Sequence, residues 1–421
     1  MDTLAEAVLW IIYIIFLFLN VFWLLVYFLD TESWKPRKRL KEYPFVTIAI
    51  PARNEEEVIE LTLKSAINID YPRDKYEIIL ILNDSKDDTL KIAKEVKRKN
   101  KETLIKILDI KEKGKGLALN KALKIANGEF FVLLDADSYV EKGALKELLT
   151  YFGNDRKIAC VLPMMKVGKP ETFLQKLQWH EYILNIFFKK IMGTINCVHV
   201  APGPFSVYRT LVLRRLGGFD HPNLTEDLEI TLKLQKHHYK IIQTTDVGVK
   251  TIAPGGIKEL YKQRNRWYKG SIHNSLSKQY RGMWFNKDYG DFGFIQMPII
   301  IIPGFLAVIL LIIQGYYFIK AAYSLLFKIY SVNFDLPTLI VNLSFDFNIL
   351  DGNYTKLVIA LLMFCLGMLT FILSHRITKE KLFKYGKLPA LVFLFLFPFF
   401  LAFVWISILL ELLISKKAQD W

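Results

Sequence analysis

The 421-residue chain has little cysteine and no segment with the composition of a flexible linker. Its three cysteines, Cys160, Cys197 and Cys365, are scattered, so they form neither a metal-binding knuckle nor a disulfide framework and fit a reducing compartment. No internal repeat is visible, and no helix-turn-helix, RNA-binding or finger pattern is present. These absences argue against a disulfide-stabilised fold and against a nucleic-acid-binding module.

The chain is also short of acidic residues, with 41 Asp and Glu against 56 Lys and Arg and a net charge of +15. Such an excess is typical of proteins that bind nucleic acid, but many of these basic residues flank long apolar runs. Anionic lipid headgroups attract basic residues in that position. We therefore expect the lipid bilayer, and not nucleic acid, to be the partner of the positive charge.

Apolar residues make up 52% of the chain and are concentrated in four runs. Each run is long enough to cross ~30 Å of hydrocarbon at ~1.5 Å per residue, although any one of them can also be a buried core helix. The first has an acidic start and no cleavage site, which favours a retained anchor over a signal peptide. Pro298 and Pro303 allow the start of the second to lie along the membrane interface. The runs are Leu4–Leu29, Ile299–Ala322, Leu357–Leu373 and Leu388–Ile414.

Basic residues beside these runs predict the orientation. Five lie between Lys35 and Lys41, and five more in His375–Lys387, so both stretches should face the cytoplasm. The Phe327–Thr355 connection has few and should lie outside. The prediction is a multi-pass protein of the cell membrane with both termini outside. Its parts are an N-terminal transmembrane helix (1–30), a cytoplasmic domain (44–290) and a C-terminal region of about three transmembrane helices (291–421).

The polar region after the first apolar run alternates short apolar stretches with helical patterns. This alternation predicts an α/β fold with a mostly parallel sheet and helices on both faces, in which ligands bind at the carboxyl ends of the strands. Further along, Glu171–Met192 suits either a helix in the membrane interface or a helix packed on the sheet. The expected strands are Phe45–Ile50, Glu77–Leu82, Leu104–Asp109 and Phe130–Asp135, and the expected helices are Glu55–Asn68, Asp87–Lys99 and Gly116–Ala126.

Polar clusters follow three of these strands. Pro51–Glu56 and Asn83–Thr89 can be ordinary turns whose acidic and hydroxyl residues cap the next helix. Asp135 and Asp137, however, follow a very apolar strand, where two carboxylates repel one another unless a proton or a cation compensates. Oxygen ligands in this arrangement suit Mg²⁺ or Mn²⁺ shared with substrate phosphates.

Two more clusters lie downstream. Thr225-Glu226-Asp227 opens an amphipathic helix, and Gln263-Arg264-Asn265-Arg266-Trp267 ends another. Taken singly, acidic residues at a helix start and an arginine beside a tryptophan are common surface features. The order in which the clusters follow one another is more specific than any one of them. Lys113-Gly114-Lys115-Gly116 comes first, then the two aspartates, and then these two clusters.

The whole series resembles the family 2 inverting glycosyltransferases, and in particular the membrane synthase branch that contains the cellulose and hyaluronan synthases. The resemblance covers about residues 44–290 and implies a GT-A-type fold and transfer of a sugar from a nucleotide sugar, expected to be a UDP-sugar, to a polysaccharide or lipid-linked acceptor. It also implies that Asp227 is the general base, with Glu226, Trp267 and Gly203 at the acceptor. Asp137, helped by Asp135, would hold Mg²⁺ or Mn²⁺. The implied donor-binding residues are Pro51, Arg53, Glu55, Asp84, Lys115, Asp135, Gln263, Arg264 and Arg266.

Some features depart from the family pattern. Asn83 stands where the family often has aspartate, and the four apolar runs are fewer than in the larger synthases. Processive synthesis and addition of one sugar to a lipid acceptor therefore both stay open. A membrane transporter, with Glu411 as the clear ionisable residue in the spans, and an inactive nucleotide-binding scaffold are the alternatives of another class. The sequence does not predict the sugar, the acceptor or the oligomeric state.

Overall fold

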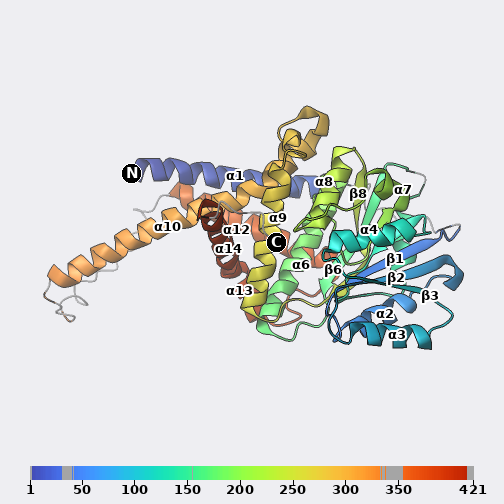
Figure 1. Cartoon of the computed structure of the whole chain (residues 1–421). Helices are drawn as coiled ribbons and strands as arrows, with labels where there is room; N and C mark the ends of the chain where they lie inside the picture. The colour runs from blue at the N-terminus through green and yellow to red at the C-terminus, as the bar shows by residue number, and fades with distance from the viewer. Residues whose placement is uncertain are drawn as a thin grey trace.

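The computed structural model describes residues 2–30, 40, 42–153, 155–331, 333, 337 and 354–414. An α/β domain carries the sheet, and long apolar helices lie at one side of it (Figure 1). In chain order the elements are α1 (Asp2–Leu29), β1 (Val46–Ala52), α2 (Ile59–Ile67), η1 (Arg73–Lys75), β2 (Tyr76–Asn83), α3 (Thr89–Lys99), β3 (Leu104–Ile110), α4 (Lys115–Ile125), β4 (Phe130–Leu133), β5 (Ser138–Val140), α5 (Ala144–Thr150), β6 (Ile158–Val167), α6 (Phe173–Thr194), β7 (Ser206–Arg209), α7 (Thr210–Arg215), α8 (Glu226–Lys236), β8 (Lys240–Thr251), α9 (Ile257–Leu276), η2 (Arg281–Met283), η3 (Lys287–Tyr289), the π-helical turn η4 (Phe292–Gln296), α10 (Met297–Ser331), α12 (Tyr354–Ile377), α13 (Lys387–Phe395) and α14 (Phe397–Ile414).

The eight strands in the part of the chain that the structure describes form one mixed sheet in the order β3-β2-β1-β4-β7-β6-β8-β5. The neighbours β3, β2, β1 and β4 are parallel, so their carboxyl ends meet at one edge, whereas β7 and β5 run antiparallel to their neighbours. The predicted strand Phe130–Asp135 ends early, at Leu133. A turn begins there, closed by a 3.1 Å bond from the Ser138 N–H to the Asp135 carbonyl, and it lifts Asp135 out of the strand.

The two faces of the sheet are covered by different helices. One face packs on α2, α3 and α5, and the other on α4, α6, α7 and α8. Alternate β1 residues divide between the two cores: Ile48 belongs to the first and Ala49 to the second. The α1 residues Trp23 and Leu24 join the second core, so the apolar helices approach the domain from that face.

Helix α6 settles the alternative left open for Glu171–Met192. One side of it packs on β6 and β8, and another side contacts α12 and α13. Thr172 caps its start, accepting a 3.2 Å hydrogen bond from the N–H of Gln175. The helix therefore lies on the sheet and forms a layer between the sheet and the apolar helices.

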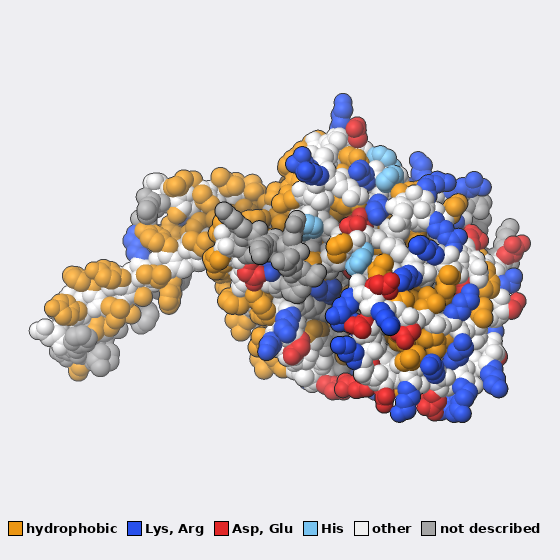
Figure 2. Space-filling view, in the orientation of Figure 1, with side chains coloured by type: hydrophobic (Ala, Val, Ile, Leu, Met, Phe, Trp, Pro, Cys, Tyr) orange, Lys and Arg blue, Asp and Glu red, His pale blue; other side chains and the backbone are white. Residues whose placement is uncertain are grey.

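Within the described residues, four helices are long and apolar enough to cross a membrane: Thr3–Leu29, Phe292–Ser331, Tyr354–Ile377 and Phe397–Ile414. Helix α10 runs through Pro303 to Ser331, so its start is not a separate interfacial helix. Its distal part carries exposed apolar side chains, among them Phe318 and Ile319, and protrudes from the body at the left of Figure 2. Most of the predicted outside connection, Phe327–Thr355, lies outside the described residues.

The last predicted apolar run, Leu388–Ile414, forms two helices, α13 and α14, and the part of it that is long and apolar enough to cross a membrane is Phe397–Ile414. The break falls at Leu396, and Pro398 stands in the first turn of α14, where its missing N–H leaves the Leu394 carbonyl without a helical partner. Helix α13 packs on α6. The last turn of α14 contacts α9 through Glu411.

Candidate active site

Two loops at the carboxyl ends of β1 and β2 are joined by hydrogen bonds. The side chain of Asn54, which has a left-handed backbone (φ 54°), accepts a 2.8 Å bond from the N–H of Lys86. The N–H of Glu55 donates to the hydroxyl of Thr89 at 2.9 Å. The polar residues of both clusters therefore build one surface beside the strand ends, in addition to capping helices.

Asp84 lies on this surface, and its own backbone conformation and hydrogen bond fix its position. It has φ 54°, and its N–H donates to the carbonyl of Ile110 at 2.8 Å. The Lys113 ammonium lies 3.9 Å from its carboxylate. Of the other predicted donor-binding residues in this part, Pro51 is buried inside β1 and Arg53 is exposed just beyond it.

Three carboxylates share the space beyond the ends of β1 and β4. Burial, followed by the charges of Asp137 and Asp135, raises the pKa of Glu55 to about 7. Burial and the neighbouring Asp135 also raise the pKa of Asp137, whose Oδ1 accepts a 2.9 Å bond from the Ser138 hydroxyl. Because each negative charge disfavours the next, this corner favours a bound proton or cation.

The chemistry of this corner fits a divalent cation shared with a diphosphate. Among the described residues, no group of three or more His, Cys, Asp or Glu side chains is placed to hold a metal ion. Asp135 and Asp137 can supply two carboxylates, and hard cations often complete their coordination with substrate phosphate oxygens and water.

Lys115 connects these carboxylates to the start of α8. Its ammonium lies 2.7 Å from Oδ1 of Asp135 and 2.9 Å from Oε1 of Glu226. Burial lowers the pKa of Lys115, but the charges of Asp135, Glu226 and Asp227 outweigh burial and leave the pKa raised. The lysine is therefore a fixed positive charge between the donor-side carboxylates and the Thr225–Asp227 segment.

Asp227 is half-buried in the first turn of α8. Burial, followed by the charge of Glu226, raises its pKa to about 6, against the lowering influence of Lys115 and Arg266. Its Oδ1 accepts a 2.9 Å bond from the N–H of Leu228. A carboxylate with a pKa near the working pH can accept a proton and release it again, which is the property of a general base.

Two glycines allow the close approaches that this site needs. A Cβ on Gly203 would lie 2.4 Å from Oδ2 of Asp135, so any larger residue at this position in the Ala201–Pro204 loop would force the carboxylate to move. A Cβ on Gly270 would lie 2.3 Å from the hydroxyl of Thr225. The contact at Gly270 seats α9 directly against the start of α8.

The side chains of the Gln263–Trp267 cluster point to different sides of helix α9. Arg266 is exposed, and its guanidinium donates to the Leu224 carbonyl at 3.2 Å, beside the start of α8. Arg264 is instead fully buried and turns to α6, where it pairs with Glu181 at 2.5 Å. The same guanidinium lies 4.2 Å from the centre of the Trp267 ring, and it donates to Gln263 at 2.5 Å. Arg266 therefore lies near the carboxylates, and Arg264 supports the tryptophan.

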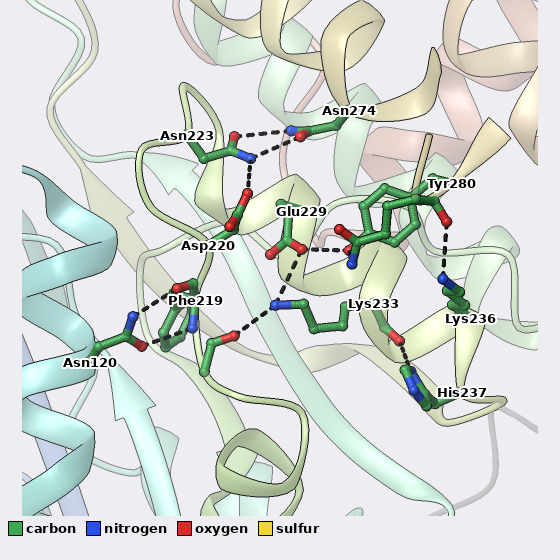
Figure 3. A network of polar contacts seen from close by, with 12 residues as sticks. Asn120, Phe219, Asp220, Asn223, Glu229, Lys233, Lys236, His237, Asn274 and Tyr280 are labelled. Carbon is green, nitrogen blue, oxygen red and sulfur yellow. Dashed lines mark hydrogen bonds and ion pairs between the residues drawn. The ribbon is translucent and has the colours of Figure 1, made fainter. Parts of the chain in front are cut away.

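A polar network that the sequence reasoning missed holds the start of α8 (Figure 3). Asn274 of α9 donates to the Thr225 hydroxyl at 3.0 Å and exchanges hydrogen bonds with Asn223 at 2.9 and 3.1 Å. At the other side of the network, Tyr280 donates to Glu229 at 2.5 Å. No sequence signal marks Asn274, because an asparagine late in an amphipathic helix has no distinctive pattern.

The same network reaches α4 (Figure 3). The Asn120 side chain donates to the Phe219 carbonyl at 2.7 Å and accepts from its N–H at 2.9 Å. A Cβ on Gly116 would lie 2.5 Å from the Asp220 carbonyl oxygen. The Lys113–Gly116 motif and the loop before Thr225 therefore fix one another, which positions Lys115 beside Glu226.

Helix α6 contributes two further residues that the sequence did not single out. The charge of Asp227 acts on Lys189, whose pKa burial lowers to about 8. Burial raises the pKa of Tyr182 to about 12, and the charges of Asp137 and Asp135 add to this. A lysine and a tyrosine in a helix with apolar periodicity give no sequence signal of their own.

Comparisons with known proteins agree with this geometry. Residues 44–270 match the family described as "Glycosyltransferase like family 2". A "Probable glycosyltransferase YdaM" of Bacillus subtilis (strain 168) is 33% identical over 244 residues, which are 56% of this chain and 57% of that protein. A "Poly-beta-1,6-N-acetyl-D-glucosamine synthase" of Staphylococcus aureus (strain COL) is 28% identical over 273 residues, which are 62% of this chain and 65% of that protein. The matches thus span less than two thirds of these relatives' length.

Among solved structures, a mannosyltransferase of Pyrobaculum calidifontis in complex with GDP-Man and Mn²⁺ is similar with a TM-score of 0.56 at 19% identity. The similarity covers 81% of this chain and 96% of that one, and it supports the fold. The family match covers the two loops at the strand ends, both aspartates, Lys115, Asp227 and the α9 cluster. The chain therefore belongs to the family described as "Glycosyltransferase like family 2".

Proposed function

We propose that the protein is a membrane-bound inverting glycosyltransferase that moves a sugar from a UDP-sugar to a polysaccharide or lipid-linked acceptor, with Asp227 as the general base. One observation carries the proposal: Lys115 bridges Asp135, on the donor side, to Glu226, beside Asp227. The groups for holding a diphosphate and for accepting a proton are therefore joined in one cluster of charged side chains.

On the donor side, the chain's own residues bind and orient the nucleotide. The surface around Asp84 and the Pro51–Glu55 turn suits hydrogen bonds to the base and ribose. A divalent cation bound by Asp137 and Asp135 would supply charge stabilisation for the departing diphosphate. Lys115 and the exposed Arg266 would supply further positive charge to the phosphates.

On the acceptor side, Asp227 would take the proton from the acceptor hydroxyl as that oxygen attacks the anomeric carbon. Attack opposite to the leaving diphosphate inverts the configuration at that carbon. Glu226 would tune the base, since its negative charge raises the pKa of Asp227. Trp267, supported by Arg264, would offer a flat face to the acceptor sugar, and the Gly203 loop would line its path.

In the membrane, we propose that the catalytic domain (44–290) faces the cytoplasm between an N-terminal helix (1–30) and a C-terminal region (291–421). The basic residues beside the apolar helices support this orientation. Protease treatment of sealed outside-out vesicles tests it: protection of the 44–290 region is expected. Cleavage within that region would place the domain outside.

For the product, we propose a polysaccharide made processively, supported by the Gln263–Trp267 cluster and by the relative named as a polysaccharide synthase. Addition of one sugar to a lipid acceptor is the alternative. Product length from the purified protein separates the two, because a single added sugar per acceptor is incompatible with processive synthesis.

The donor is tested by screening UDP- and GDP-sugars with purified protein and reading nucleotide release with and without membrane lipid. We expect release from a UDP-sugar in the presence of Mg²⁺ or Mn²⁺ and its loss in Asp227→Asn. Asp74→Asn is the matched control, because Asp74 is an exposed carboxylate in η1, at the opposite edge of the sheet. Wild-type rates in Asp227→Asn would show that Asp227 is not the base.

A further inference from the structure

Helix α14 carries a single charged residue, Glu411, in an otherwise apolar sequence. A carboxylate in such a helix is costly unless it finds partners, and it often marks a functional contact. The proposed transfer reaction does not use Glu411 directly. Its role must therefore come from the helix that it touches.

Three side chains of α9 converge on this carboxylate. The Lys269 ammonium forms an ion pair with Oε2, the Asn265 amide donates to Oε1 at 3.3 Å, and the Tyr261 hydroxyl lies 3.5 Å from the same oxygen. Residues spaced by four lie on one face of a helix. Glu411 therefore binds a stripe of two helical turns of α9 with both of its oxygens.

Neighbouring contacts extend this stripe. The Tyr268 ring stacks on the α14 residue Trp405, with 5.0 Å between ring centres. A Cβ on Gly304 of α10 would lie 2.2 Å from the same tryptophan, so α10 closes on α14 from another side. Helix α14 is thus held in place and can serve as a fixed reference for α9.

The other sides of α9 carry residues of the candidate active site. Gly270 is in close contact with Thr225, and Arg266 bonds the Leu224 carbonyl. A shift of α9 by one residue would move these groups along the helix axis by ~1.5 Å. Such a shift is enough to break the close contact between Gly270 and Thr225 at the start of α8. Misplacement of about 1 Å in an active site can reduce the rate about a hundredfold.

We propose that Glu411 is a positioning residue: from α14 it fixes the axial register of α9 and so places Gln263, Arg266 and Trp267 at the active site. The C-terminal apolar helix is then part of the catalytic apparatus, in addition to a means of attachment. The role of the α9 residues in this inference rests on the proposed function. The contacts between α9 and α14 do not.

Charge reversal tests the proposal. Glu411→Lys is expected to lower the rate of nucleotide release at saturating donor at least tenfold, and Lys269→Glu should do the same. The double variant, which restores opposite charges, should recover to within about threefold of the wild type. The control is Leu413→Lys, which adds the same charge to α14 at a side chain that is 83% exposed, and it should leave the rate unchanged. The KM for the donor should change less than the rate, since the base and ribose surface around Asp84 is independent of α9.

A wild-type rate in Glu411→Lys, or a double variant no faster than either single one, would overturn the proposal. If Glu411→Lys does not accumulate as a folded protein, Glu411→Gln takes its place, with an expected loss of at least threefold. Hydrogen exchange of the 257–276 segment in the unliganded protein needs no activity. We expect this segment to exchange at least tenfold faster in the Glu411 variant than in the wild type. In Leu413→Lys it should exchange at the wild-type rate. Equal exchange would refute the positioning role. If the wild type released no nucleotide from any donor while the exchange difference held, the proposed function would fail and the positioning role would stand.

Discussion

Replacing Asp227 with asparagine is expected to abolish sugar transfer and at the same time to stabilise the folded protein. The two side chains have nearly the same shape, so packing in the first turn of α8 should be kept. The asparagine amide cannot act as a base, so transfer should stop while donor binding survives. The expected gain in stability arises because the native protein holds the Asp227 carboxylate in a place that disfavours its charge.

The size of the gain comes from the pKa. Burial and Glu226 raise the pKa of Asp227 from 3.8 to about 6, a difference of roughly two units. At ~1.4 kcal/mol per unit, the charged aspartate costs the native state on the order of 3 kcal/mol at pH 7. For a domain of this size, such a free energy corresponds to a rise of roughly 5–10 °C in the unfolding midpoint.

The sign of the pH dependence follows from the same shift. Between pH 4 and pH 6 the native protein holds more protons at Asp227 than the unfolded chain, so this residue contributes stability as the pH falls from 7 towards 4. Asp227→Asn lacks this contribution. Its gain in unfolding stability over the wild type should therefore shrink as the pH falls from 7 towards 4.

Thermal unfolding in detergent at pH 7 and pH 5, read by intrinsic fluorescence, measures both quantities, with Asp74→Asn as the control. A lower midpoint for Asp227→Asn at pH 7, or an advantage that does not shrink at pH 5, would refute the assignment of a raised pKa. Retained transfer activity would refute the assignment of the base.

Four further outcomes are expected. The rate at low donor concentration should fall below about pH 6, where Asp227 becomes protonated, and Glu226→Gln should move this limit to lower pH by removing a negative neighbour; an unmoved limit would argue against the coupling. Asp137→Ala should weaken the metal dependence of donor binding in titration calorimetry, and an unchanged dependence would exclude this residue as a ligand. Arg264→Met should lower the unfolding midpoint, since breaking a buried ion pair costs about 3–5 kcal/mol. Arg266→Met should instead weaken donor turnover with little change in the midpoint, and the reverse pattern would exchange the roles of the two arginines.

Local patterns predicted the central elements closely. Strands β2 and β3 and helices α3 and α4 each begin or end within two residues of the predicted bounds. Apolar residues with period two or near four need only local burial to give these elements, so the sequence carries the information. The acidic turn after β1 was different: the predicted helix from Glu55 begins only at Ile59, because Glu55 is held by the loop after β2.

The two arginines of α9 show that a sequence motif does not predict which way each of its side chains points. Both were predicted to bind the donor, because both belong to the Gln263–Trp267 cluster. A helix places adjacent residues ~100° apart, but only its packing partners decide which of them faces the site. Here Arg264 pairs with Glu181 of α6, which is distant in sequence, whereas Arg266 bonds the Leu224 carbonyl beside α8.

The sequence by itself determined the α/β class, the apolar helices and the residue types of a diphosphate and proton-transfer site, because composition, periodicity and spacing are local properties. The tertiary structure decided which of these residues meet. It brought Lys115 between Asp135 and Glu226 and placed Glu411 of α14 against α9. Such long-range contacts depend on the packing of whole helices against the sheet, and no local pattern along the chain encodes them.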